Sequence, residues 1–240
     1  MKRLILVFCG LILMGSCAKE KSENTMQVTG SVKGLKKGRL YLQKIQDTLL
    51  VAIDSLVVDG DSNFDFSTEL ESPEVFYLYL NKKDGDEIND RITFFGEPGT
   101  IQINTDVEFF EVNARIEGSK SHEKLAQYKK MMSKFNDRNL ELIKASLEAR
   151  KEKDSIKVDS IAQQSDRNVL RGYLYTLNFA LTNKDSYVAP YIALSEVFDA
   201  RVKYLDTIYN SLAPEVADSK YGKQLKDYIA DIKSKEETPE

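Results

Sequence analysis

The sequence predicts an α+β protein in which an N-terminal antiparallel β-sandwich or barrel of about eight strands precedes a C-terminal α-helical region. Apolar and polar residues alternate in short segments between residues 27 and 118. Turn signals separate these segments at a spacing of roughly ten residues, which is typical of sandwiches and barrels. After Gly118 the apolar residues recur every three or four positions, as on one face of a helix. Strands followed by helices indicate an α+β order.

The β half is marked by alternation and by two turns. Leu40 and Leu42 alternate with Tyr41 and Gln43, and Phe76 and Leu78 alternate with the pair Tyr77 and Tyr79. The dipeptide Asp59-Gly60 between two alternating segments is a strong hairpin signal, and Glu97-Pro98-Gly99 is a second turn. The expected strands are residues 28–32, 39–45, 54–58, 63–67, 75–80, 91–95, 100–104 and 112–116.

The helical half carries three apolar stripes with helical spacing. The charged segment 148–154 between the first two is either a solvated helix turn or a break, and two shorter helices are expected at 191–197, after Pro190, and at 202–212. Ser219 is a plausible N-cap for the last helix, which we expect to pack against the second stripe because an isolated helix is marginal in water. The stripes are Leu125, Tyr128, Met132 and Phe135, then Leu170, Leu174, Leu177 and Leu181, then Tyr221, Leu225, Tyr228 and Ile232.

The first residues have the pattern of an export signal. Lys2 and Arg3 precede an apolar segment, residues 4–14, that is far shorter than the ~20 residues of a membrane-spanning helix. Gly15 and Ser16 before Cys17 resemble a bacterial lipobox, which implies cleavage after residue 16, lipidation of Cys17 and a tether over 17–26. An ordinary signal peptide cleaved elsewhere is the alternative. Residues 19–21 partly resemble a signal for export to the cell surface.

Composition excludes several classes of function. Removal of Lys2 and Arg3 changes the formal net charge from −4 to −6, which argues against a nucleic-acid partner. Cys9 leaves with the signal and Cys17 is committed to lipid, so the mature chain has no thiol for redox catalysis. His122 is the single histidine, whereas zinc sites need three or four ligands. We therefore expect no cofactor.

Several segments of the chain carry a family resemblance. The sequence 38–42, the hairpin from Asp54 through Asp59-Gly60 to Phe66, and the turn 95–99 resemble a β-rich domain of unknown function. That domain occurs in Bacteroidota lipoproteins, often ahead of an AhpC/TSA-type thioredoxin-like domain, and residues 116–119 resemble its end. Residues 183–190 and 219–222 resemble the linker helices of those proteins. The chain ends at Glu240 about where the thioredoxin-like domain would begin, so that redox function is not carried over.

Four groups of residues are candidate sites. Tyr77 and Tyr79 share a strand face and would either stack a sugar or peptide or pack against a helix or second sheet. His122 is expected in the first turn of a helix. The alternating acids from Asp59 to Asp65 are interpreted as a hairpin turn, because Phe64 and Leu70 replace the Gly and Glu that a calcium loop requires. Weak metal candidates are Asp84, Asp86, Glu87 and Asp90.

The sequence thus favours a non-catalytic binding or docking module, lipid-anchored to the outer membrane and facing the periplasm or the exterior. Residues 27–118 form the β domain, 119–234 the helical region and 235–240 a frayed tail. Expected partners are the membrane and an envelope protein. One alternative is an accessory subunit that recruits a thioredoxin-like partner in trans. A weaker alternative is a carboxylate-based hydrolase using residues 84–90.

Overall fold

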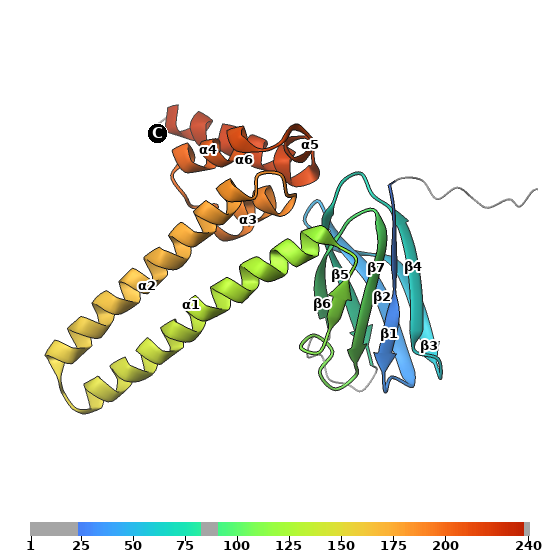
Figure 1. The fold of residues 1–240 in the computed structure, drawn as a ribbon, viewed down its shortest axis with the longest axis horizontal. Helices are drawn as coiled ribbons and strands as arrows, with labels where there is room; N and C mark the ends of the chain where they lie inside the picture. Colours follow the sequence, from blue (N-terminus) through green and yellow to red (C-terminus); the bar gives the residue numbers. More distant parts are fainter. Residues whose placement is uncertain (1–23, 83–90, 238–240) are drawn as a thin grey trace, which may run out of the picture.

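The computed structural model describes residues 24–82 and 91–237 and confirms the predicted α+β class (Figure 1). Eight strands form two four-stranded sheets, ordered β4-β1-β7-β8 and β3-β2-β5-β6. The sheets are separate, so the β half is a sandwich and not a barrel. The strands are β1 (Thr25–Lys33), β2 (Lys37–Gln46), β3 (Leu49–Asp59), β4 (Asn63–Glu69), β5 (Glu74–Asn81), β6 (Arg91–Gly96), β7 (Gly99–Asp106) and β8 (Arg115–Glu117).

The strand pairing is antiparallel with one exception. β1 and β7 are parallel, with Met26 opposite Gly99. The chain crosses from one sheet to the other through the turn at Glu97 and Pro98, and it enters β7 at the end of the sandwich where β1 also begins. Because both strands enter the sheet from the same end, β1 and β7 run parallel, and the expectation of a purely antiparallel sandwich is wrong for these two strands.

The sandwich core is built by the predicted alternation. Leu40, Leu42, Phe76 and Leu78 are fully buried between the sheets, and the rings of Phe76 and Phe94 stack across β5 and β6 with centroids 5.9 Å apart. Three strands start well away from their expected positions. β1 begins inside the expected tether, with Met26 in the core, and β3 begins at Leu49, five residues before the expected strand. Val112 lies in a turn before β8 and is 83% exposed.

Gly118 marks the change from strands to helices. Its φ of +92° belongs to the left-handed region that favours glycine. A Cβ at this position would lie 2.2 Å from the carbonyl oxygen of Thr100. The chain therefore turns here closely against β7 before α1 begins. The helices are α1 (Lys120–Lys151), α2 (Ser155–Thr182), α3 (Val188–Glu196), α4 (Val202–Ser211), α5 (Pro214–Ala217) and α6 (Lys220–Glu237).

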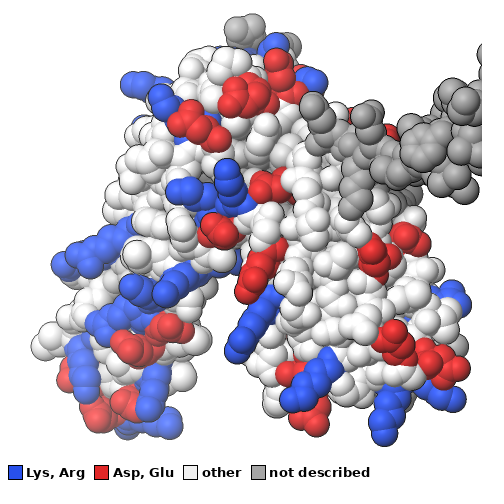
Figure 2. Space-filling model, turned by 45° about the vertical axis from the view of Figure 1, so that its right-hand side comes forward, with Lys and Arg blue, Asp and Glu red and all other residues white. Residues whose placement is uncertain are grey.

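Helices α1 and α2 form a long antiparallel hairpin that projects away from the sandwich (Figure 1). The charged segment after Glu148 contains the break, at residues 152–154, and Asp154 caps α2 by accepting a hydrogen bond from the Lys157 amide at 2.9 Å. Figure 2 shows the hairpin and the sandwich as two lobes separated by a notch. None of the helices in the described ranges has the length and apolar character needed to span a bilayer.

The last helix packs differently from the prediction. Leu225 is fully buried, but α6 lies mainly along α3, α4 and α5. Only Leu177 and Leu181 of the expected stripe join the cluster around Leu225, whereas Leu170 and Leu174 are more than half exposed. The short helices α3 and α4 lie against the C-terminal part of α2, so α6 packs on them instead. α6 extends through Glu237, three residues into the expected frayed tail.

A candidate binding cleft between the sandwich and the helices

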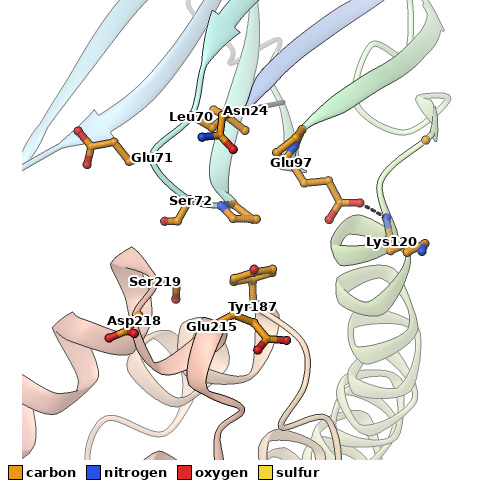
Figure 3. Close-up of a pocket in the computed structure, with 13 residues that line it drawn as sticks. Asn24, Leu70, Glu71, Ser72, Glu97, Lys120, Tyr187, Glu215, Asp218 and Ser219 are labelled. Atoms are coloured by element: carbon orange, nitrogen blue, oxygen red, sulfur yellow. Dashed lines mark hydrogen bonds between the residues drawn. The ribbon is translucent and has the colours of Figure 1, made fainter. Parts of the chain in front are cut away.

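A cleft with a volume of about 620 Å³ opens where the sandwich meets the helices (Figure 3). Its sandwich wall comes from the start of β1, the loop between β4 and β5, and the turn between β6 and β7. Its helical wall comes from the first residue of α1, from Tyr187 just before α3 and from the segments around α5. The charged and aromatic residues that line it are Glu71, Glu97, Lys120, Tyr187, Glu215 and Asp218.

The cleft is acidic around one aromatic ring. Glu71, Glu215 and Asp218 are exposed, and their side chains have no hydrogen-bond or ion-pair partner among the described residues. Tyr187 lies between the two walls, where burial raises the pKa of its hydroxyl and the charges of Glu215 and Glu97 raise it further. Lys120 is the one lysine among the lining residues, so the cleft carries a net negative charge.

Glu97 belongs to the cleft wall and also fixes the start of α1. One carboxylate oxygen accepts a hydrogen bond from the Lys120 amide at 2.5 Å, and the other accepts from the Ser121 amide and hydroxyl at 3.2 and 2.6 Å. A carboxylate satisfies the free amides at a helix N-terminus and interacts favourably with the helix dipole. The turn between β6 and β7 thereby holds α1 in place.

His122 and Ser119 complete this attachment. The Ser119 hydroxyl donates to the Phe95 carbonyl at 2.7 Å and accepts from the His122 amide at 2.9 Å. Nδ1 of His122 accepts from the Phe95 amide at 3.4 Å. Burial, with a smaller contribution from Lys129, lowers the pKa of His122 to about 4, so the ring is neutral at pH 7. His122 lies in the first turn of α1, where it positions the helix.

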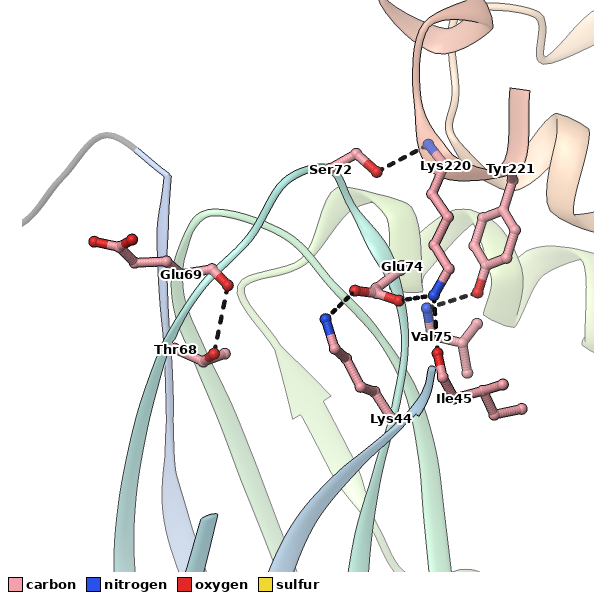
Figure 4. Close-up of polar contacts among 9 residues, drawn as sticks. All are labelled: Lys44, Ile45, Thr68, Glu69, Ser72, Glu74, Val75, Lys220 and Tyr221. Carbon is pink, nitrogen blue, oxygen red and sulfur yellow. Dashed lines mark hydrogen bonds and ion pairs between the residues drawn. The ribbon is translucent and has the colours of Figure 1, made fainter. Parts of the chain in front are cut away.

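A second attachment joins the sandwich to α6 (Figure 4). The Glu74 carboxylate, which is 4% exposed, pairs with Lys44 at 2.9 Å and with Lys220. Nζ of Lys220 also donates to the Ile45 carbonyl at 3.0 Å, and the Val75 amide donates to the Tyr221 hydroxyl at 3.1 Å. Burial raises the pKa of Tyr221.

Neither attachment is predicted by the sequence. Glu74 and Lys220 are 146 residues apart, and neither lies in a motif. One local signal was available, because Ser219 was expected as an N-cap, and its hydroxyl does accept from the Gly222 amide at 3.2 Å. The cleft depends on residues from both halves of the chain, so no single stretch of sequence indicates it.

Comparison with known proteins identifies part of the chain. A DUF4369 domain, described as a domain of unknown function, covers residues 26–125. No curated protein matches the chain. The DUF4369 match extends past β8 through the first turns of α1, and it therefore includes Glu97, Ser119 and His122, which anchor that helix to the sheet.

Tyr77 and Tyr79, the candidate binding residues from the sequence, lie on the outer face of the DUF4369 domain but in different surroundings. Tyr79 stacks on Tyr41 of β2, with ring centroids 5.8 Å apart and an angle of 29° between the planes. Tyr77 packs partly against the helices, in the cluster that contains Phe95 and Val188. The Arg91 guanidinium carbon lies 5.4 Å from the Tyr79 ring centroid and 5.7 Å from that of Tyr77.

The other sequence candidates are partly outside the described residues. Cys17 and the acidic cluster Asp84, Asp86, Glu87 and Asp90 lie there. In the DUF4369 hairpin, Asp61 accepts hydrogen bonds from the amide and side chain of Asn63 at 3.0 and 2.8 Å, as a turn residue does. Within residues 24–82 and 91–237, no group of His, Cys, Asp and Glu side chains is arranged to hold a metal ion.

Proposed function

We propose that this chain is a lipid-anchored, non-catalytic protein of the bacterial cell envelope that binds a cationic segment of a partner in the cleft between the sandwich and the helices. The observation that carries the binding function is the cleft itself, with Tyr187 set between the carboxylates of Glu215 and Glu97. An aromatic ring among carboxylates favours an ammonium or guanidinium group through cation–π and ionic contacts.

Anchoring is supported by the pattern of residues 2–17 and by the resemblance to Bacteroidota lipoproteins. Lipid attachment at Cys17 would leave seven residues before Asn24, which lines the cleft. Seven extended residues span at most ~25 Å. The cleft would then face a partner held close to the membrane, and the α1–α2 hairpin would project away from it.

A non-catalytic function is supported by how the buried ionisable groups are used. Glu74 is saturated by two ammonium groups, and neutral His122 is held by a backbone amide. Both groups therefore serve the attachment of the helices to the sandwich. Around the cleft, the exposed carboxylates of Glu71, Glu215 and Asp218 outnumber the single lysine, Lys120, and suit recognition of a cation.

The test is titration of the full-length chain, purified in detergent, with a short lysine-rich peptide and with a glutamate-rich peptide of equal length. We expect the lysine-rich peptide to bind and the glutamate-rich peptide not to bind. The double variant Glu215→Gln with Asp218→Asn should weaken binding of the lysine-rich peptide about tenfold, because charge-assisted contacts are lost. Glu148→Gln, an exposed change on α1, is the matched control. Equal binding by the double variant and the control would exclude the cleft.

A further inference from the structure

We propose that the outer face of the β3-β2-β5-β6 sheet is a second binding surface, separate from the cleft, and that it takes an anionic saccharide. The surface consists of Arg39, Tyr41, Tyr79, Arg91 and Tyr77, which we call the tyrosine–arginine ladder. All five residues are partly exposed. They come from β2, β5 and β6 of the DUF4369 domain.

The ladder is a continuous series of arginine and tyrosine side chains. The Arg39 guanidinium carbon lies 6.0 Å from the Tyr41 ring centroid, Tyr41 stacks on Tyr79, and Arg91 lies over both Tyr79 and Tyr77. Both guanidiniums lie within cation–π distance of the rings, which favours their position on this face. The ladder therefore presents two guanidinium groups, whose N–H donors suit carboxylate, sulfate or phosphate oxygens.

The charge of this face differs from that of the whole chain. No carboxylate among the described residues pairs with Arg39 or Arg91. The neighbouring outward-facing residues on the same strands, Gln43 and Thr93, are neutral. Among the described residues of this face, the two arginines are thus not balanced by acidic partners, in a chain of net charge −4, and charge complementarity favours an anionic ligand.

The polar groups favour a sugar over an acidic peptide. β2 and β5 are internal strands whose backbone groups are paired on both sides, so a peptide lying over Tyr41 and Tyr79 could not add to the sheet as a strand there. The Gln43 side-chain oxygen, beside Tyr77 in the sheet, has no hydrogen-bond donor among the described residues. A sugar chain with carboxylates combines hydroxyl donors for the polar side chains of this face with carboxylates that accept from the arginines.

The spacing of the two arginines favours a chain of anionic sugars. Arg39 is on β2 and Arg91 on β6, with β5 between them, and Arg39 is opposite Asn81 while Arg91 is opposite Tyr79. Two strand spacings and a two-residue offset place their backbones about 12 Å apart. A saccharide with repeated carboxylates can place one carboxylate at each guanidinium.

The experiment is titration of the full-length chain with a short oligogalacturonate, with the neutral oligogalactose of the same length, and with an oligoglutamate of matched charge. We expect the oligogalacturonate to bind and the other two to bind at least tenfold more weakly. The double variant Arg39→Gln with Arg91→Gln should weaken oligogalacturonate binding about tenfold or more. Arg171→Gln, an exposed change on α2, should leave it unchanged.

Three outcomes would overturn this proposal. Equal affinity for the neutral sugar would remove the role of the arginines. Equal affinity for oligoglutamate would show an acidic-peptide surface instead. Unchanged affinity in the double variant would place the sugar elsewhere. If the double variant fails to fold, amide shifts of the wild-type chain during the titration decide the question, because they must centre on Tyr41, Tyr79 and Arg91.

Discussion

The buried Glu74 carboxylate and the Lys220 ammonium group form an ion pair between the first residue of β5 and the first residue of α6, 146 positions apart in the chain. Together with the contacts of Glu97 at the start of α1, this pair attaches the helical region to the sandwich at two places. The cleft between these attachments is therefore held by both halves of the chain. The stability of the attachments and the function of the cleft can be tested separately.

Glu74→Gln should lower the free energy of unfolding by roughly 2–3 kcal/mol. Without the Glu74 carboxylate, the ammonium groups of Lys44 and Lys220 lose their partner. The expected cost is lower than for a fully buried ion pair, because both lysine side chains remain 28–29% exposed. Urea denaturation measures the change. The exposed control Glu148→Gln should cost under ~0.5 kcal/mol. An equally small cost for Glu74→Gln would mean that the pair does not hold the helices.

Leu225→Ala and Leu174→Ala separate the observed packing of the helices from the predicted one. Leu225 is fully buried, so its truncation should cost ~2–5 kcal/mol. Leu174 is 53% exposed, and its truncation should cost under ~1 kcal/mol. Chemical denaturation of both variants gives the comparison. A large cost at Leu174 would restore the predicted role of the Leu170–Leu181 stripe as the partner of α6.

Gly118→Ala should be more destabilising than Gly99→Ala. Both glycines have positive φ values, +92° and +116°, so both substitutions cost about 1–2 kcal/mol of backbone strain. Only at Gly118 would the new Cβ also meet a backbone oxygen, that of Thr100, whereas the space around Gly99 is open. We expect a difference of at least ~1 kcal/mol in the free energy of unfolding. Equal costs would show that the turn before α1 is not tightly packed.

His122 should make stability depend on pH between about 6.5 and 4. The folded-state pKa is lowered to about 4 from the ordinary value of 6.5, so the unfolded chain binds the extra proton first as the pH falls. Stability from this residue is complete above pH 6.5 and is lost by about pH 4, by roughly 2–3 kcal/mol at most. Denaturation of the wild type and His122→Gln across this range isolates the effect. If the free energies of unfolding of the two proteins changed with pH in parallel, the proposed role of His122 would be contradicted.

Cys17→Ser tests the proposed anchor. The variant should lose lipidation and fail to mature normally, because the proposed lipid would be attached through the thiol of Cys17. Stable membrane anchoring depends on the acyl chains, at ~0.8 kcal/mol for each buried CH₂. Detergent partitioning and apparent mass measure the outcome. A variant that matures to the same size and still partitions into detergent would contradict the lipoprotein assignment.

The sandwich was predictable from sequence because its signals are local. Alternation with a period of two places Leu40 and Leu42 on the opposite face from Tyr41, and Gly118 stands where the period changes. Leu170 and Leu174 belong to a regular apolar stripe, yet both are more than half exposed. The short helices cover only the C-terminal part of α2, and the periodicity of the stripe does not indicate where that cover ends. The parallel pairing of β1 with β7 likewise depends on where the chain crosses between the sheets.

The candidate site was less predictable because its contacts are distant in sequence. Tyr77 and Tyr79 could be named from one strand, but their partner Tyr41 lies on another strand. Tyr187 and Glu215 reach the cleft only because α1 and α6 are attached to the sandwich through Glu97 and Glu74.

The most direct test of the central claim is an amide-shift titration of the isotope-labelled full-length chain with the lysine-rich peptide. The proposed function predicts saturable shifts centred on Lys120, Tyr187 and Asp218, which weaken as salt is added because the contacts are ionic and exposed. Absence of shifts around the cleft, or shifts confined to the far end of the α1–α2 hairpin, would contradict it.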